Sequence, residues 1–257
     1  MHIISYKILT IMKKEKFIIS IVLSLCIITS FLIAGLSFYY TKGPSKTISV
    51  VGLAENDFVS DLIVWNLSFT TQNMDMKEAY TKIKKQSIIV KDYLINKGLK
   101  ENEFVFKAVS NYKSYRYEWN ENAKRTFEIF DGYVLTQTVR IESHEVEKVE
   151  KVSREVSELL DADIQLDTRE PEYYYTKLAD LKIKMLAEAS KDARNRAETI
   201  TTNSGAKLKG LKTANMGVFQ ITAPNSSEEN YTWGGAFNTS SKMKRASINM
   251  KLTYYVK

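Results

Sequence analysis

The hydrophobic pattern of the chain begins with one long uncharged run. No charged residue occurs from Phe17 to Thr41. The 24 residues of 17–40 would extend roughly 36 Å as a helix, which exceeds the hydrocarbon core of a bilayer at roughly 30 Å. Phe38, Tyr39 and Tyr40 stand where aromatic side chains meet the membrane interface. The pattern predicts a transmembrane helix at 17–40.

The segments that flank this run predict its orientation. Residues 1–16 carry four lysines against the single acid Glu15, and cytoplasmic flanks are enriched in Lys and Arg. Residues 41–46 are polar, contain Gly43-Pro44 and read as a linker. We therefore expect a cytoplasmic N-terminus, a single-pass anchor in the cell membrane, and a periplasmic or extracellular domain at 47–257.

Two alternatives to an anchor stay open. A cleaved signal peptide has a shorter apolar region and a cleavage site of small residues, and no convincing site precedes Tyr39. A lipoprotein signal would modify Cys26, but Leu25 is large for the position before the modified cysteine and the apolar run continues past it. The anchor remains the preferred interpretation.

After the linker the hydrophobic period changes repeatedly. Segments rich in β-branched and aromatic residues predict strands at 47–53, 58–71, 103–119 and 128–142, and Gly132 suggests a bulge or a close backbone approach. Apolar residues recur at three- and four-residue spacing after Asp75, where Gly98 would end a helix. That helix pattern is formed by Met76, Ala79, Tyr80, Ile83, Ser87, Val90 and Leu94.

The second half of the chain repeats this alternation of elements. A helix is predicted at 146–160, a short strand at 164–168, and a long helix with a stripe of small residues from Leu178 to Ile200. Strands at 211–221 and 247–256 flank a polar loop at 222–242. The order ββ-α-ββ-α-β-α-ββ predicts an α+β domain whose helices pack on a mainly antiparallel sheet.

Several short motifs occur along the chain after the linker. They are Ile48 to Gly52 followed by Asp61, Leu94 with Gly98, Gly132-Tyr133, and Ala193-Arg194 with Arg196-Ala197-Glu198, Gly205, Leu208 and Gly210. Together they resemble a known family, the SIMPL domain proteins of the bacterial periplasm and envelope. The resemblance covers roughly residues 47–257. It implies an envelope location, a tendency to oligomerise and an association with tolerance of oxidative stress. It implies no catalytic residue, because the family has no agreed enzymatic activity.

The composition restricts the chemistry that the chain can perform. Hydrophobic residues make up 44% of the chain, enough for a core, and the formal net charge is +7. The single cysteine lies in the apolar run, so residues 47–257 can form no disulfide and offer no thiol for peroxide chemistry. We expect no cofactor, no metal site and no enzymatic activity.

Three motifs that suggest ligands or catalysis have simpler explanations. Residues 205–210 follow a helix, whereas a phosphate-binding loop follows a strand. Asp161 to Glu172 has EF-hand spacing but carries Leu166 where that loop requires Gly. His144 would have to act alone as a general base, and no nucleophile motif accompanies it.

Aromatic residues in two segments are the candidate partner contacts. They are Tyr112, Tyr115, Tyr117 and Trp119 in one hairpin, and Tyr231, Trp233 and Phe237 in the polar loop. Ordinary packing within the fold is the alternative for both, and an extracytoplasmic position argues against nucleic acid as a ligand. We therefore expect a membrane-anchored, non-enzymatic domain that forms a homo-oligomer or binds an envelope protein or glycan. An envelope enzyme such as a hydrolase, or a small-ligand-binding module, remains the alternative.

Overall fold

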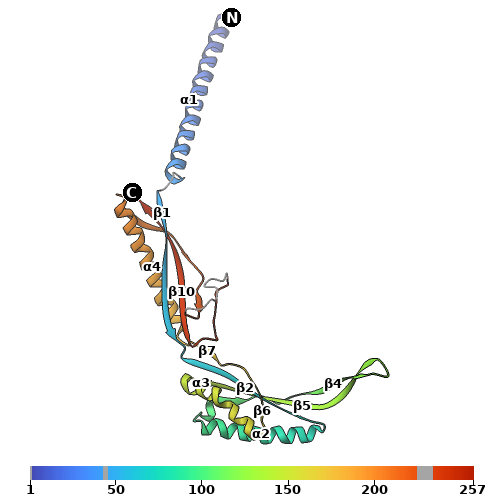
Figure 1. Ribbon diagram of the computed structural model, residues 1–257. Coiled ribbons are helices and arrows are strands. Elements are labelled where there is room, and N and C mark those ends of the chain that lie inside the picture. The colour runs from blue at the N-terminus through green and yellow to red at the C-terminus, as the bar shows by residue number, and fades with distance from the viewer. Residues whose placement is uncertain (1, 43–45, 225–233) are drawn as a thin grey trace. The chain divides into compact units, whose positions relative to one another are not determined.

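The computed structural model describes residues 2–42, 46–224 and 234–257. Helix α1 (His2–Lys42) contains the segment Ile19–Tyr40, which is long and apolar enough to cross a membrane. No described residue before Val50 is buried, so the packed core begins only after the linker (Figure 1). The chain after α1 can therefore be studied without it.

The strands form two separate sheets rather than the single sheet that the sequence suggested. The first has the order β1-β10-β8, with β9 paired to β10. Its strands are β1 (Thr47–Val59), β8 (Leu208–Met216), β9 (Gln220–Thr222) and β10 (Met243–Val256). The second has the order β3-β5-β2-β6, with β4 paired to β5 and β7 to β2. Its strands are β2 (Leu62–Asn73), β3 (Phe104–Phe106), β4 (Ser110–Asn120), β5 (Arg125–Ser143), β6 (Gln165–Thr168) and β7 (Glu172–Tyr174).

The chain divides into two compact units. One comprises 1–49, 197–213 and 253–257, and the other comprises 50–196 and 214–252. Strands β1, β8 and β10 and helix α4 (Leu178–Asn203) contribute residues to both units. The second sheet and the helices α2 and α3 that cover it belong to the larger unit.

Helix α2 (Met76–Asn96) forms where the sequence predicts it, and its ends have clear causes. The Asp75 carboxylate accepts hydrogen bonds from the backbone N–H groups of Lys77 and Glu78 at 2.8 and 3.0 Å, which caps the helix. Gly98 follows with a φ of +87° that glycine adopts without strain. The buried face of α2 includes Ala79, Ile83, Val90 and Leu94, whereas Met76 and Tyr80 are exposed, so only part of the predicted periodic pattern is buried.

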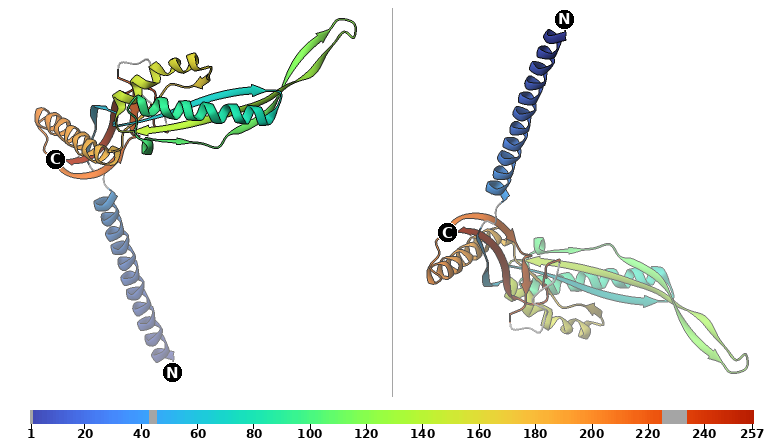
Figure 2. Two further views of the ribbon diagram at one scale, coloured as in Figure 1. Left: turned by 90° about the horizontal axis from the view of Figure 1, so that it is seen from below. Right: turned by 90° about the horizontal axis from the view of Figure 1, so that it is seen from above.

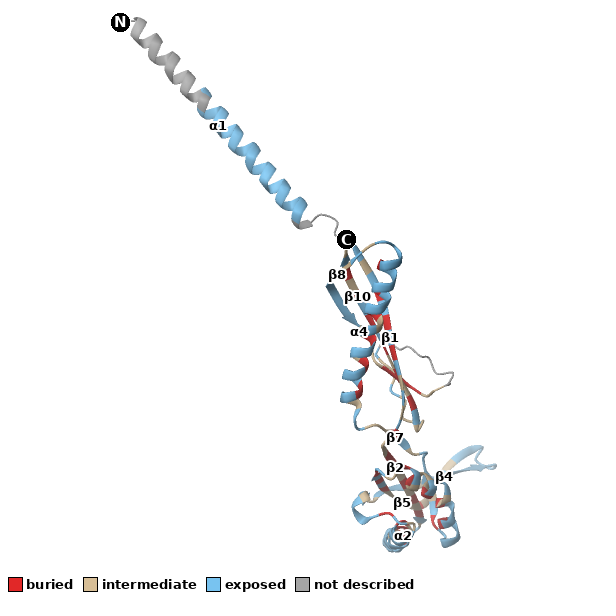
Figure 3. Cartoon of the chain, turned by 90° about the vertical axis from the view of Figure 1, so that its left-hand side faces the viewer, coloured by how far each residue is buried: buried red, intermediate tan, exposed pale blue. Residues whose placement is uncertain are grey.

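The main core lies between α2, helix α3 (Val146–Glu155) and the second sheet (Figures 2 and 3). The predicted helix at 146–160 changes to a 3-10 helix at Val156–Ala162. The sheet contributes Ile63, Trp65, Leu67, Phe69, Leu135, Val139 and Ile141 to this core. Fully burying one such side chain stabilises the fold by about 1.5–3 kcal/mol, so these residues fix α2 and α3 on one face of the sheet.

Strand β1 is longer than the sequence suggested. The sequence predicts two strands separated by residues 54–57, but the first strand continues to Val59 and the chain turns at Ser60-Asp61. Alternation explains the error, since the acidic residues Glu55 and Asp57 occupy outward positions while Val50 and Ala54 point inward. Asp57 pairs with Arg245 of β10 at 2.6 and 2.7 Å.

Candidate functional site

The hairpin of β4 and β5 carries most of the aromatic residues singled out from the sequence. Strand β5 pairs with β2 only as far as Tyr133, which lies opposite Asn73 at the end of β2. From Gly132 to the turn at 121–124 the hairpin is therefore a two-stranded ribbon (Figure 2). Helix α2 begins at Met76, three residues after β2 ends at Asn73, and does not extend along the ribbon.

A β-bulge marks the point where the ribbon leaves the sheet. Ser114 pairs with Gly132 and Tyr115 with Phe130, so Asp131 is an extra residue on β5. Gly132 has a φ of +111°, and a Cβ there would lie 2.8 Å from the carbonyl oxygen of Asn73. Both the backbone angle and the close approach require glycine, which confirms the prediction of a bulge or a close contact at this residue.

The bulge assembles one aromatic face on the ribbon. Residues directly opposite on paired strands share a face, and past the bulge Tyr115 lies opposite Phe130, Tyr117 opposite Glu128 and Trp119 opposite Thr126. The rings of Tyr115 and Phe130 are 5.7 Å apart, and those of Phe130 and Tyr133 are 5.3 Å apart. We call Tyr115, Tyr117, Trp119 and Phe130 the aromatic face.

This aromatic face continues the side of the sheet that faces the core. Tyr133 packs against the core beneath α2, as do the inward residues Leu135 and Val139 on the same strand. Past Gly132 no helix of the described residues covers that side (Figure 2), and Tyr117 is 71% and Trp119 57% exposed. The ribbon thus presents a core-like surface without its cover, the kind of exposed apolar patch that marks interaction sites.

The other face of the ribbon has a different character. It carries an ion pair between Arg116 and Glu118 at 3.0 Å. Tyr112 is exposed on this same side of β4 but lies before the ribbon, opposite Val134. Arg125 lies over the ring of Phe127 at 4.5 Å. The four hairpin aromatics predicted from the sequence therefore divide, since Tyr112 lies on the opposite face from Tyr115, Tyr117 and Trp119.

The structure does not join the second predicted group to the hairpin. Tyr231 and Trp233 lie outside the described residues. Phe237 is half exposed and its ring lies 6.3 Å from that of Tyr174 on β7, with its backbone bridged to Ile221. Sequence reasoning also missed Phe130 and Tyr133, whose period-2 spacing is interrupted by the bulge at Asp131.

The surroundings of His144 are not those of a catalytic triad. Its Nδ1 lies 2.7 Å from the backbone oxygen of Asp61 rather than from the carboxylate. The Asp61 carboxylate instead accepts hydrogen bonds from the backbone N–H and the hydroxyl of Thr176, both at 2.7 Å. Asp61 therefore holds the turn between β1 and β2 against the segment that follows β7.

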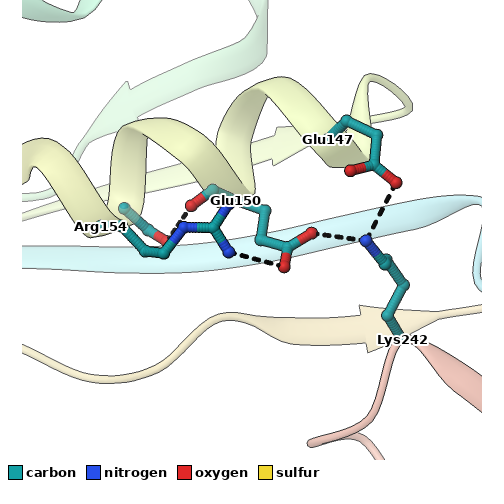
Figure 4. A network of polar contacts seen from close by, with 5 residues as sticks. Glu147, Glu150, Arg154 and Lys242 are labelled. Atoms are coloured by element: carbon teal, nitrogen blue, oxygen red, sulfur yellow. Dashed lines mark hydrogen bonds and ion pairs between the residues drawn. The ribbon is translucent and has the colours of Figure 1, made fainter.

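A charged network links α3 to the segment before β10 (Figure 4). The Lys242 ammonium lies 2.9 Å from Glu147 and 2.8 Å from Glu150, and Arg154 lies 2.9 Å from Glu150. The hydrogen bond from Lys242, with a smaller contribution from Arg154, lowers the pKa of the Glu150 carboxyl. The same carboxylates raise the pKa of Lys242. The network is thus strongest while Glu150 is ionised.

Comparison with known proteins places the chain in a family. Among the described residues no group of three or more His, Cys, Asp or Glu could hold a metal ion. No curated protein matches the chain. The profile of the SIMPL family, described as a protein of unknown function (DUF541), matches residues 48–252. That match includes residues of every strand of both sheets and the helices α2, α3 and α4, and the chain belongs to the SIMPL family.

Proposed function

We propose that this protein is a membrane-anchored SIMPL domain that assembles with further copies of itself, outside the cytoplasm, through the aromatic face of the β4–β5 ribbon. The observation that carries the proposal is the continuity of this face with the core side of the sheet. Tyr133, Phe130 and Tyr115 form an unbroken series of ring contacts that starts against the core and ends on the uncovered ribbon.

The placement of the residues favours binding over local packing. Tyr117 and Trp119 lie beyond the point where β2 stops pairing with β5, and among the described residues nothing in their own sheet buries them. Tyr and Trp are enriched at protein interfaces because they bury a large area at a small entropic cost. Leaving such side chains in water without a partner would be unfavourable.

The anchor supports a role at the membrane. The segment Ile19–Tyr40 can span a bilayer by its length and composition. The lysines before it favour a cytoplasmic N-terminus, and a single span would then leave residues 47–257 on the other side of the membrane. Confinement to one membrane also raises the local concentration of copies, so that a contact of modest affinity suffices for assembly.

Light scattering on residues 46–257 tests the proposal. We expect the unaltered domain to show a mass that rises with concentration, and a Tyr117→Ser/Trp119→Ser variant to stay monomeric. Removing a central aromatic contact costs about 2 kcal/mol or more, which corresponds to at least a roughly 30-fold weaker association. Tyr112→Ser, which alters the opposite face of the same strand, is the matched control and should assemble normally. A domain that stays monomeric at every concentration would contradict the proposal.

A further inference from the structure

A groove beside helix α2 has the chemistry that an aromatic ribbon would need. Its walls are Tyr80, Lys84, Ile88 and Lys91 of α2 on one side and Phe106 and Val109 on the other, and we call it the α2 groove. It has a volume of about 310 Å³. A cavity of about 150 Å³ is enough to hold benzene, so the groove can take the ring of a Tyr or Trp.

The lining of the groove is mostly apolar, and its charged residues are positive. Ile83 is fully buried at its base, and Ile88 on its wall is 57% exposed. Its lining, as far as the structure describes the chain, includes two lysines and no carboxylate. Lys91 pairs with Glu101 at 2.8 Å, whereas Lys84 makes no ion pair among the described residues. The groove therefore combines an exposed apolar wall with one uncompensated positive charge.

The aromatic face has the complementary pattern. Between Tyr115 and the turn, the six residues that the strand pairing places on this face are Tyr115, Phe130, Tyr117, Glu128, Trp119 and Thr126. Glu128 is the one charged residue among them, and it lies directly opposite Tyr117. An ammonium group can interact with this carboxylate and with the faces of the neighbouring rings. Apolar surface and charge thus match between the ribbon and the groove.

The two surfaces cannot meet within one copy of the chain. Val109 lines the groove and immediately precedes β4. Ten residue steps separate Ser110 from Asn120, which carries the ribbon tip roughly 33 Å away along the strand. A paired ribbon cannot turn back over that length to reach the groove from which it starts.

We infer that the α2 groove receives the aromatic face of the ribbon from a second copy of this chain, with Trp119 and Tyr117 entering beside Ile88 and Lys84. This inference rests on the proposed function and specifies its geometry. The contact is head-to-tail, because the surface given by one copy differs from the surface used by the next. Such a contact builds chains or closed rings rather than stopping at a two-fold dimer.

Mixing two defective variants of residues 46–257 tests the inference. Trp119→Ala removes the inserting ring but keeps the groove, and Ile88→Asp places a negative charge in the groove but keeps the ribbon. Each variant alone should be monomeric by native mass spectrometry. Their mixture, with one partner labelled with ¹⁵N, should give a one-to-one heterodimer that grows no further. Ile183→Asp makes the same change at a 70% exposed position on α4 and should assemble like the unaltered domain.

The outcomes separate this inference from the proposal beneath it. If the unaltered domain assembles but the mixture stays monomeric, or if Ile88→Asp assembles alone, the groove is not the receptor and the inference is wrong, while the ribbon can still mediate assembly in another way. If the unaltered domain is itself monomeric, the proposed function fails first. Circular dichroism spectra like that of the unaltered domain would establish that both variants are folded, since both changed side chains are exposed.

Discussion

Replacing Gly52 of β1 by alanine should destabilise the protein more than replacing Gly210 of β8 by alanine. Gly52 lies on the inward side of β1 against α4. A Cβ at this position would overlap the carbonyl oxygen of Ala189 and would lie 2.7 Å from the Cβ of Ala193. The stripe of small residues predicted on α4 therefore lets this helix pack closely against β1 at Gly52.

The magnitude follows from which atoms would have to move. Adding a methylene to a packed core costs about 1–3 kcal/mol. The first obstacle here is the backbone of α4, which cannot rotate away as a side chain can, so we expect about 3 kcal/mol. For a domain of this size that loss lowers the melting temperature by roughly 6–12 °C.

Urea unfolding of residues 46–257, followed by circular dichroism, measures the effect as a shift of the midpoint at constant slope. Gly210→Ala on β8 is the control, because a Cβ there meets nothing within 4 Å, and it should change the stability by no more than about 0.5 kcal/mol. Adding Ala193→Gly to Gly52→Ala should not restore stability, since the overlap with Ala189 remains. Equal midpoints for Gly52→Ala and Gly210→Ala would refute the packing argument.

Three further predictions concern the charged network, the bulge and the membrane. The pKa of Glu150 is lowered in the folded state. The stability that the Glu150 carboxylate contributes is therefore present above its unfolded pKa of about 4.3 and is lost as the pH falls through the lower folded pKa. Lys242→Met should cost about 1–3 kcal/mol at neutral pH and flatten the acid limb of a curve of stability against pH, and an unchanged acid limb would contradict the network. Gly132→Ala should lower stability by about 1–3 kcal/mol and weaken self-assembly measured by light scattering. Gly205→Ala is the control and should leave assembly intact, because Gly205 also has a positive φ but open space around it. Equal loss of assembly in both variants would show that the position of the ribbon is not the cause. Trypsin should degrade residues 47–257 in sealed right-side-out vesicles and spare them in inverted vesicles, and the reverse pattern would invert the topology.

Local patterns predicted the helices and the C-terminal strand well. Asp75 and Gly98 delimit α2 because a capping carboxylate and a positive φ act within a few residues. The alternation from Ser247 to Val256 survives in β10, where Ile248, Met250, Leu252 and Tyr254 are buried. In these elements the residues that decide the structure are neighbours in the sequence.

The division into two sheets could not be predicted in this way. Strand β1 pairs with β10, which is distant from it in the sequence. Strand β2 belongs to the other sheet, although only two residues separate it from β1. Nothing in the alternation of β1 and β2 specifies which strands they pair with. Met76 and Tyr80 fit a helical period but fall outside the covered face, since tertiary packing decides which side of α2 is buried.

Only part of the candidate site could be predicted, because the rest depends on contacts between residues that are distant in the sequence. Tyr115, Tyr117 and Trp119 share a face because β4 is regular, and strict alternation suffices to see this. Phe130 joins them only because Asp131 is an extra residue on β5. The bulge depends on the approach of Gly132 to Asn73, a contact between strands that no sequence window contains. The α2 groove likewise combines a helix with residues from β3 and the segment after it.

Photo-crosslinking in the native membrane tests the central claim most directly. The chain of residues 1–257 would carry p-benzoylphenylalanine at position 119, with the same group at position 112 on the opposite face of β4 as the control. After irradiation we predict a product at twice the 29.5 kDa chain mass for position 119 and little of it for position 112. Crosslinking from position 119 only to lipid or to a different protein, or equal yields of the doubled mass from both positions, would contradict assembly through the aromatic face.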